Sequence, residues 1–196
     1  MLIEKHLLAV AAGIDTQTGW MRHVRRVPSP NCDERPAGSL PELIVVHGIS
    51  LPPGEFGGPW IDRLFTNALP PGEHPYFEQI KDLKVSSHVL IRRDGEVVQY
   101  VPFHRRAWHA GASSYQGRER CNDFSVGVEL EGADEIPYEP AQYRILSALI
   151  HELCEAYPSL SPTRIAGHCE IAPGRKTDPG PAFDWQRLHA LLRATA

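Results

Sequence analysis

Residues 167–181 bring together side chains that can bind a metal ion or carry a proton. His168, Lys176 and Asp178 all occur in this short segment. Its proline and glycine residues exclude a continuous helix or strand, so the segment is predicted to be a loop of defined shape. Pro179 biases Asp178 toward an extended backbone, which fixes the direction of the carboxylate. A metal site in this loop needs a further ligand from elsewhere in the chain.

The sequence offers that ligand at the end of a short apolar run, residues 43–47. The continuous, β-branched character of this run predicts a strand buried on both faces, with His47 as its last residue. A histidine satisfied by a backbone carbonyl is the ordinary alternative at such a position. Two imidazoles and one carboxylate, with a fourth position open to water, form a recognised catalytic Zn²⁺ site. The candidate ligands are His47, His168 and Asp178.

A second strand is predicted at residues 126–131, because apolar residues alternate there with glycine and two glutamates. The alternation places Glu129 and Glu131 on the face opposite the apolar side chains, and Gly127 leaves room beside Glu129. A carboxylate on a core strand must be paired or face a cleft, unless this strand face is solvated. We therefore expect Glu129 to act as the general base toward a zinc-activated water, with Glu131 as the alternative.

Lys176, two residues before Asp178, is the candidate for stabilising negative charge. Its ammonium could face the oxyanion that develops when water attacks a carbonyl carbon. The alternative is a clamp for a substrate carboxylate, which would affect substrate binding rather than turnover.

The remaining pattern predicts a single α/β domain, a mixed central β-sheet flanked by helices. Asp94-Gly95 between two apolar runs predicts a hairpin, so at least one strand pair is antiparallel. The long Gly/Pro-rich loop at 48–60 is expected to form one wall of a cleft. Helices are expected at residues 60–65, 75–83 and 140–157, and after Asp184.

Composition limits the function. The net charge of -4 over 196 residues argues against a nucleic-acid binder, whose electrostatic footprint is a basic stripe. The four cysteines form no CxxC pair and are predicted to be free thiols in a reducing compartment. No apolar run approaches the roughly 20 residues of a membrane span. Residues 7–12, preceded by one lysine and an acidic Glu4, make a poor signal peptide, so we expect a cytoplasmic protein. We also expect it to be a monomer.

At these residues the sequence resembles the zinc-dependent N-acetylmuramoyl-L-alanine amidases, and within them the cytoplasmic 1,6-anhydro-N-acetylmuramyl-L-alanine amidases of cell-wall recycling (AmpD type). The resemblance covers residues 19–192, so we expect an amidase domain over residues 14–196 and an N-terminal extension at 1–13. Gly48 departs from the family, which typically has asparagine there. The resemblance is carried by separated motifs: RRVPSPN at 25–31, VH at 46–47, ISLPPG at 49–54, RAWHAG at 106–111, CNDFS at 121–125, ELEG at 129–132, GHC at 167–169 and RKTDPG at 175–180.

The resemblance implies a fold of the peptidoglycan-recognition type and a zinc hydrolase. The reaction implied is hydrolysis of the amide that joins the lactyl group of 1,6-anhydro-N-acetylmuramic acid to L-alanine of the stem peptide. The implied partners are small soluble anhydro-muropeptides. Zinc would be held by the three ligands proposed above, assisted by Glu129 and Lys176.

Four residues are expected to contact the substrate. The resemblance places Lys84 and Arg120 near the carboxylates of the stem peptide. Trp108 offers an apolar platform for the sugar bicycle, and His109 a hydrogen-bond donor beside it.

Two other functions are conceivable for the same residues. A non-catalytic muropeptide-binding module would be expected to lose a zinc ligand, whereas this chain keeps a complete candidate set. A periplasmic amidase that acts on intact peptidoglycan would require export, which the N-terminal sequence disfavours. The sequence therefore favours the cytoplasmic enzyme.

Overall fold

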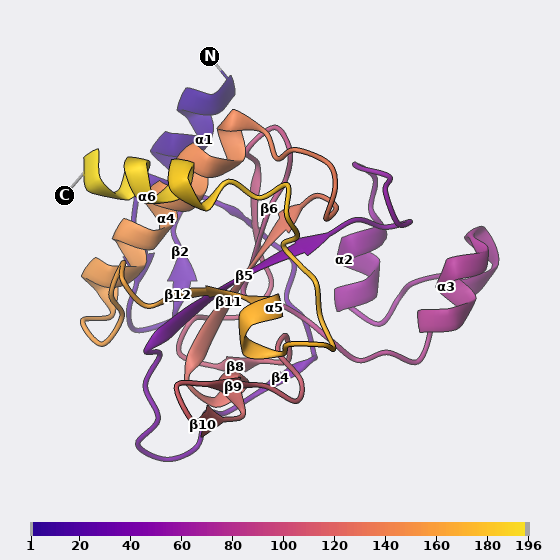
Figure 1. Cartoon of the computed structure of the whole chain (residues 1–196), viewed down its shortest axis with the longest axis horizontal. Coiled ribbons are helices and arrows are strands. Elements are labelled where there is room, and N and C mark those ends of the chain that lie inside the picture. Colours follow the sequence, from indigo (N-terminus) through magenta and orange to yellow (C-terminus); the bar gives the residue numbers. More distant parts are fainter. Residues whose placement is uncertain (1, 195–196) are drawn as a thin grey trace.

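A six-stranded mixed sheet lies at the centre of the computed structural model, which describes residues 2–194 (Figure 1). The strand order is β12-β5-β11-β6-β7-β3. Strands β12, β5, β11 and β6 run parallel, β7 is antiparallel to β6, and β3 is parallel to β7. The strands span Arg25–Arg26 (β3), Leu43–Ile49 (β5), Val89–Ile91 (β6), Val97–Gln99 (β7), Ser125–Glu131 (β11) and Ile165–Gly167 (β12).

The two longest strands, β5 and β11, pair along their whole length and form the middle of the sheet. The first four residues of β5 are almost completely buried, as expected for a parallel strand covered on both faces. His47 pairs with Glu129, while Gly167 at the end of β12 pairs with Val46. The carboxyl ends of these parallel strands therefore present their polar residues at the same edge of the sheet.

Three helices cover one face of the sheet: α1 (Leu2–Ala11), α4 (Pro140–Ala156) and α6 (Trp185–Ala194) (Figure 1). Their buried side chains form one hydrophobic core with Ile44, Val46 and Val128 of the central strands. A capping box between Glu139 and Gln142 starts α4, with Pro140 in its first turn. Within residues 2–194, every helix is too short or too polar to span a bilayer.

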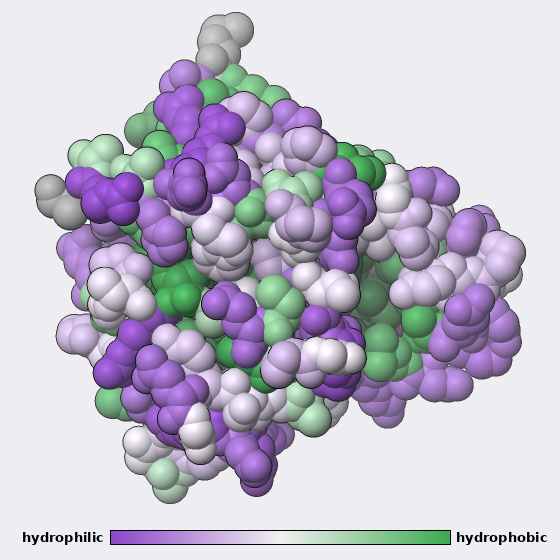
Figure 2. Space-filling view, in the orientation of Figure 1, coloured by the Kyte–Doolittle hydropathy of each residue, from purple (hydrophilic) through white to green (hydrophobic). Residues whose placement is uncertain are grey.

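Helices α2 (Trp60–Phe65) and α3 (Pro75–Ile80) form a lobe to the side of the sheet (Figure 1). They pack against Leu90, Val98 and Tyr100 in a second hydrophobic cluster. Figure 2 shows a hollow with hydrophobic atoms at its floor between this lobe and the body of the protein. The remaining short elements are β1 (Ile14–Asp15), β2 (Trp20–Met21), β4 (Cys32–Asp33), η1 (Pro71–Glu73), β8 (Arg106–Ala107), β9 (Ser114–Tyr115), β10 (Arg118–Glu119), η2 (Cys121–Asp123) and α5 (His168–Ile171).

The predicted fold class is confirmed, and most predicted elements are present. Strand β5 continues to Ile49, two residues beyond the predicted end at His47. The hairpin β6–β7 turns at Asp94-Gly95 as predicted, and Asp184 caps α6 by accepting the backbone N–H of Arg187 (2.9 Å). Helix α3 ends at Ile80 rather than at residue 83, because the chain turns there through a bond from Leu83 N–H to the Ile80 carbonyl.

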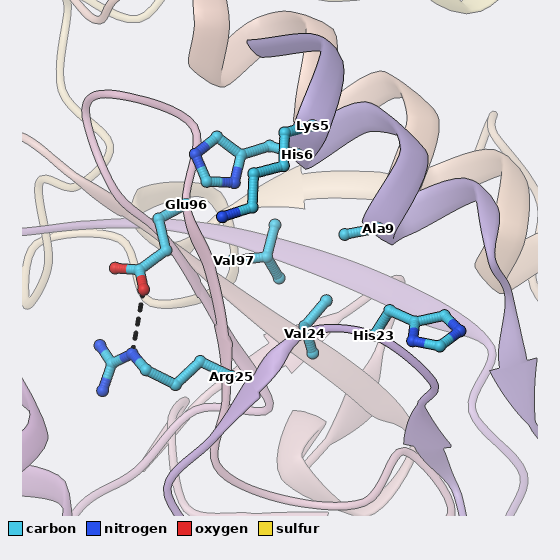
Figure 3. A pocket seen from close by; sticks show the side chains of 8 residues that line it. All are labelled: Lys5, His6, Ala9, His23, Val24, Arg25, Glu96 and Val97. Carbon is cyan, nitrogen blue, oxygen red and sulfur yellow. Dashed lines mark hydrogen bonds and ion pairs between the residues drawn. The ribbon is translucent and has the colours of Figure 1, made fainter. Parts of the chain in front are cut away.

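Residues 2–11, within the predicted extension, form α1 and pack on α4. Val10 of α1 is completely buried, and Ile3 and Leu7 pack against the same core. A small hollow of about 190 Å³ lies beside α1, where Arg25 Nε donates to Glu96 (3.1 Å) (Figure 3).

His88, just before β6, is completely buried among polar partners. Its Nδ1 accepts the backbone N–H of Gly127 (3.0 Å), so the ring proton lies on Nε2, which donates to the carbonyl of Arg105 (3.0 Å). Burial, and after it the nearby cation of Arg35, lowers the pKa of His88 to about 3. The ring is therefore neutral in the folded protein at neutral pH.

We predict that His88 makes the metal-free protein sensitive to acid. Between pH 3 and its ordinary pKa of 6.5, the unfolded chain binds a proton at this ring that the folded chain does not. The free energy of unfolding should therefore rise with pH across this window and level off above it. H88Q should reduce that slope by up to about 1.4 kcal/mol per pH unit in denaturant titrations. H23Q, at an exposed histidine, is the control; an equal slope in H88Q and wild type would contradict the assignment.

Candidate metal centre and catalytic cleft

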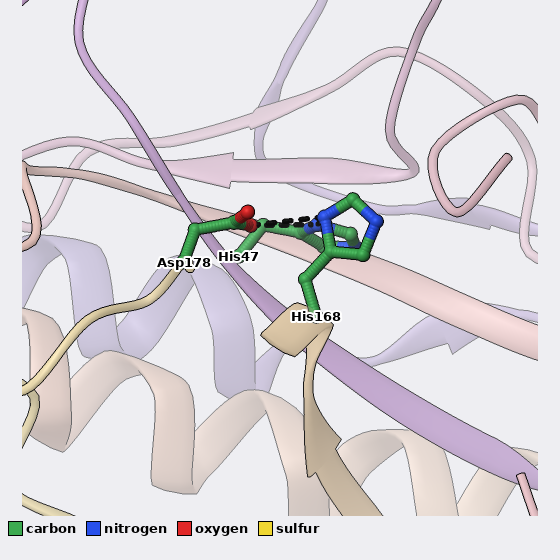
Figure 4. A group of neighbouring side chains, drawn as sticks. All are labelled: His47, His168 and Asp178. Carbon is green, nitrogen blue, oxygen red and sulfur yellow. Dashed lines mark hydrogen bonds and ion pairs between the residues drawn. The ribbon is translucent and has the colours of Figure 1, made fainter. Parts of the chain in front are cut away.

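The three predicted ligands converge at the carboxyl ends of the parallel strands (Figure 4). His47 comes from β5, His168 begins α5, and Asp178 lies in the loop that follows. The Nδ1 atoms of the two histidines are 2.9 Å apart, and Asp178 Oδ2 lies 3.2 Å from His47 Nδ1 and 3.1 Å from His168 Nδ1. Ligand atoms of a tetrahedral zinc ion are roughly 3.3 Å from one another, so this spacing fits such an ion.

His47 has the protonation state that metal binding requires. Burial lowers the pKa of His47 to about 4, which keeps the imidazole neutral. Neutral imidazoles and a carboxylate are the metal-binding forms of these groups.

The carbonyl of Ala110 orients His168. It lies 3.3 Å from His168 Nε2, and because a carbonyl only accepts, Nε2 carries the proton and Nδ1 presents a lone pair. Arg175 Nη2 donates to the same carbonyl (2.6 Å) and to that of Ala112 (2.7 Å), which fixes this loop beside the ring. Such a hydrogen bond from the outer nitrogen is typical of metal-binding histidines.

The loop that carries Asp178 is fastened on both sides. Cys169 N–H donates to the Asp178 carbonyl (2.9 Å), and the Tyr138 hydroxyl donates to the Pro179 carbonyl (2.9 Å). A Cβ on Gly48 would collide with the Tyr138 hydroxyl oxygen, so a larger residue at Gly48 requires Tyr138 to move. Gly180 has φ +81° and faces the backbone of Asp134, where a Cβ would also collide.

The ligands lie in a cleft of about 510 Å³, the size of a small-molecule site. Its apolar wall includes Leu64, Phe65, Tyr76 and Ile80 of the α2–α3 lobe, and corresponds to the hollow in Figure 2. The loop after His47 also lines it, as the sequence predicted. The sheet is therefore open at the carboxyl ends of β5 and β11, beside the α2–α3 lobe.

Glu129 lies in this cleft beside His47. Its side chain is 8% exposed, and its Oε2 is buried without a hydrogen-bond partner among residues 2–194. Burial, and then the negative charge of Asp178, raises the pKa of Glu129 well above its ordinary value, while Lys176 opposes the shift. A carboxyl with a raised pKa and a free oxygen is suited to taking up and returning a proton.

Glu131 has a different environment, although it lies on the same face of β11. One oxygen accepts the backbone N–H of Gly57 (2.6 Å) and Arg92 Nη1 (3.2 Å), and the other accepts Arg93 N–H (3.3 Å). Its side chain is 3% exposed. Both carboxylates are thus buried, and the solvated strand face considered from the sequence is wrong. Glu131 fastens the Gly/Pro-rich loop to the sheet.

The other predicted residues are divided between the cleft and its surroundings. Lys176 is exposed and lines the cleft, and so does His109, whose Nδ1 is 2.9 Å from His47 Nε2. Trp108 and Lys84 are outside the lining; Trp108 Nε1 donates to Asp33 (3.2 Å), and Lys84 is exposed next to lining residues.

Arg120 is not among the residues that line the cleft, and its contact with substrate stays a prediction. It borders a separate hollow of about 500 Å³ and pairs with Asp123 (3.3 Å), with 72% of its side chain exposed.

Arg175 and Tyr138, which support the loops around the ligands, were not predicted from the sequence as site residues. Arg175 belongs to the RKTDPG motif. Tyr138 donates to the carbonyl of Pro179, 41 positions away, and no local signal in the sequence indicates this contact.

A family model of N-acetylmuramoyl-L-alanine amidases matches residues 37–181, which include all three ligands, Glu129 and Lys176. The chain belongs to this family. The 1,6-anhydro-N-acetylmuramyl-L-alanine amidase AmpD of Citrobacter freundii is 63% identical over 174 residues, 89% of this chain and 92% of that protein.

Two solved structures of amidases are similar to this chain. A crystal structure of a selenomethionine AmpD derivative is 61% identical, with a TM-score of 0.88 and coverage of 91% of this chain and 98% of that one. The amidase AmiD of Escherichia coli, in complex with the substrate anhydro-N-acetylmuramic acid-L-Ala-D-γ-Glu-L-Lys, is 26% identical, with a TM-score of 0.56 and coverage of 92% and 66%.

We predict that substitution of Glu131 lowers stability, whereas substitution of Glu129 lowers turnover. E131Q removes the charge that Arg92 and Gly57 N–H bind, and should lower the free energy of unfolding by about 1–3 kcal/mol. E129Q should leave stability unchanged or higher, because its carboxyl is buried without a full set of partners, and should lower turnover by about 10²–10⁴-fold. Urea unfolding and steady-state kinetics measure both. A loss of turnover confined to a stable E131Q would reverse the two roles.

Proposed function

We propose that the protein is a zinc-dependent hydrolase that cleaves the amide between the lactyl group of 1,6-anhydro-N-acetylmuramic acid and L-alanine of the stem peptide. The observation that carries this proposal is the convergence of His47, His168 and Asp178 beside the buried Glu129, in an amidase whose AmpD relatives are named for that bond. Zinc bound by these residues would polarise the amide carbonyl and lower the pKa of a water molecule.

Glu129 would carry the proton in this reaction. Its side chain lines the cleft that also contains the ligands, so it can accept a proton from the attacking water. The same carboxyl can then give the proton to the nitrogen of the departing L-alanine, which leaves as a neutral amine. Its raised pKa favours the second of these transfers.

Lys176 would stabilise the charge on the carbonyl oxygen. Its backbone N–H donates to the carbonyl of Ala172 (3.1 Å), and Asp178 two residues later is fixed by the metal site, so the intervening chain has little freedom. An ammonium held there interacts more strongly with the anionic transition state than with the neutral amide.

The cleft supports a small soluble substrate. Its apolar wall matches the anhydro-sugar, and its volume of about 510 Å³ lies within the range of small-ligand sites. The AmiD structure holds a short anhydro-muropeptide of this chemical type. All of the proposed machinery comes from one chain, which supports a monomer. We further propose, from the AmpD relatives, that this monomer acts in the cytoplasm in peptidoglycan recycling.

The proposal is tested by substrate and metal dependence. Purified protein should contain about one zinc per chain and release stem peptide from soluble anhydro-muropeptide faster than from intact peptidoglycan, measured by mass spectrometry. Chelation should abolish release, and added zinc should restore it. Full activity in zinc-free protein would refute the metal mechanism, and a preference for intact peptidoglycan would favour the periplasmic alternative.

Lys176→Ala tests the oxyanion role. Removing one such donor typically lowers kcat by about 10²–10³-fold, so we expect that loss with little change in KM and full zinc occupancy. Lys81→Ala removes an exposed lysine that pairs with Glu78 outside the cleft lining, and should leave kcat and KM unchanged. If Lys176→Ala raises KM and spares kcat, the residue is instead a clamp for a stem-peptide carboxylate.

A further inference from the structure

His109 lies flat against the sheet next to the candidate metal centre. Ser125, Gly127 and Glu129 alternate along β11 and share one face. A Cβ on Gly127 would lie 2.5 Å from His109 Cγ, so the imidazole occupies the space that a side chain would take. The room beside Glu129 that the sequence predicted for Gly127 is thus filled by His109. The ring spans from Ser125 at one end to His47 at the other.

The hydrogen bonds of this ring determine where its proton lies. Ser125 Oγ donates its only proton to the carbonyl of Cys121 (2.6 Å), because a carbonyl can only accept. Toward His109 Nε2, 3.1 Å away, the same oxygen must therefore accept, and His109 carries its proton on Nε2. His109 Nδ1 is left as an acceptor in the neutral ring.

The proton position on His109 determines that of the metal ligand His47. His109 Nδ1 lies 2.9 Å from His47 Nε2, so His47 must donate from Nε2 to complete this contact. The lone pair of His47 is then on Nδ1, which faces His168 Nδ1 (2.9 Å) and Asp178 Oδ2 (3.2 Å). The three facing atoms carry no proton between them, and a cation would offset the repulsion of their lone pairs.

We propose that Ser125 and His109 are positioning residues that hold His47 in the tautomer whose Nδ1 can bind zinc, through the chain of hydrogen bonds from His47 to His109, Ser125 and the Cys121 carbonyl. This inference rests on the metal site of the proposed function. His109 thereby acts on the metal through His47, in addition to any contact with substrate.

These hydrogen bonds are shielded from water, so the loss of one partner changes the tautomers of the others. His47 is 1% exposed, Ser125 is completely buried and His109 is 8% exposed, so water cannot readily replace a lost partner. Without the Ser125 hydroxyl, His109 gains by moving its proton from Nε2 to Nδ1. His47 must then accept at Nε2 and carry its own proton on Nδ1, where it can bond to Asp178 but blocks the metal.

The test compares S125A with S87A. Ser87 is also completely buried, but its hydroxyl has no hydrogen-bond partner among residues 2–194. Zinc affinity is measured by competition with a chromophoric chelator, and we expect S125A to bind about 10–100-fold more weakly than wild type while S87A binds normally. Equal affinity of S125A and wild type would overturn the proposal.

A second measurement does not depend on zinc, and its wild-type part needs no variant. The ¹⁵N chemical shifts of the imidazoles in metal-free wild-type protein distinguish a protonated from a bare ring nitrogen. We expect His109 and His47 both to carry the proton on Nε2, and S125A to show both protons shifted to Nδ1. A proton on Nδ1 of either ring in wild type would refute the relay. Failure of wild type to bind zinc would refute the proposed metal site, while the tautomers would still test the relay.

Discussion

The parallel pairing of β5 with β11 is the constraint on which the rest of the site depends. This register sets His47 beside Glu129, and the parallel pairing of β12 with β5 brings His168 to the same edge. A shift of one residue in either pairing would turn the polar side chains toward the helical core and the apolar ones into the cleft. The hydrophobic core under α4 and α6 therefore protects the geometry of the metal site, because slippage would expose it.

The cost of burying polar groups explains how the two faces of the sheet differ. On the open face, buried polar side chains are held by specific partners, as Glu131 is by Gly57 and Arg92. Glu129 lacks such partners, since one of its oxygens has none within residues 2–194. A buried carboxyl without partners destabilises a fold and is typical of functional sites. On β11, Glu131 therefore contributes to stability, and Glu129, two residues earlier, is the proposed reactive group.

The sequence by itself determined the elements whose signals are local. The continuous apolar run of β5, the alternation in β11, the Asp-Gly turn of the hairpin and the periodicity of α4 each depend on neighbours within a few residues. Residue types and motif spacing were also sufficient to propose His47, His168 and Asp178, because few side chains bind zinc and Pro179 restricts the loop that holds one of them.

Only the tertiary structure decided which of these side chains meet. His109 was expected at the substrate, yet its ring also contacts His47, 62 positions away in sequence. The two glutamates of β11 look alike in the sequence. In the fold, the Gly/Pro-rich loop binds Glu131 through Gly57 N–H, whereas one oxygen of Glu129 has no partner among residues 2–194. Arg120 borders a different hollow from the ligands. Such contacts join distant segments through the packing of the whole chain, and the local patterns that specify strands and helices carry no record of them.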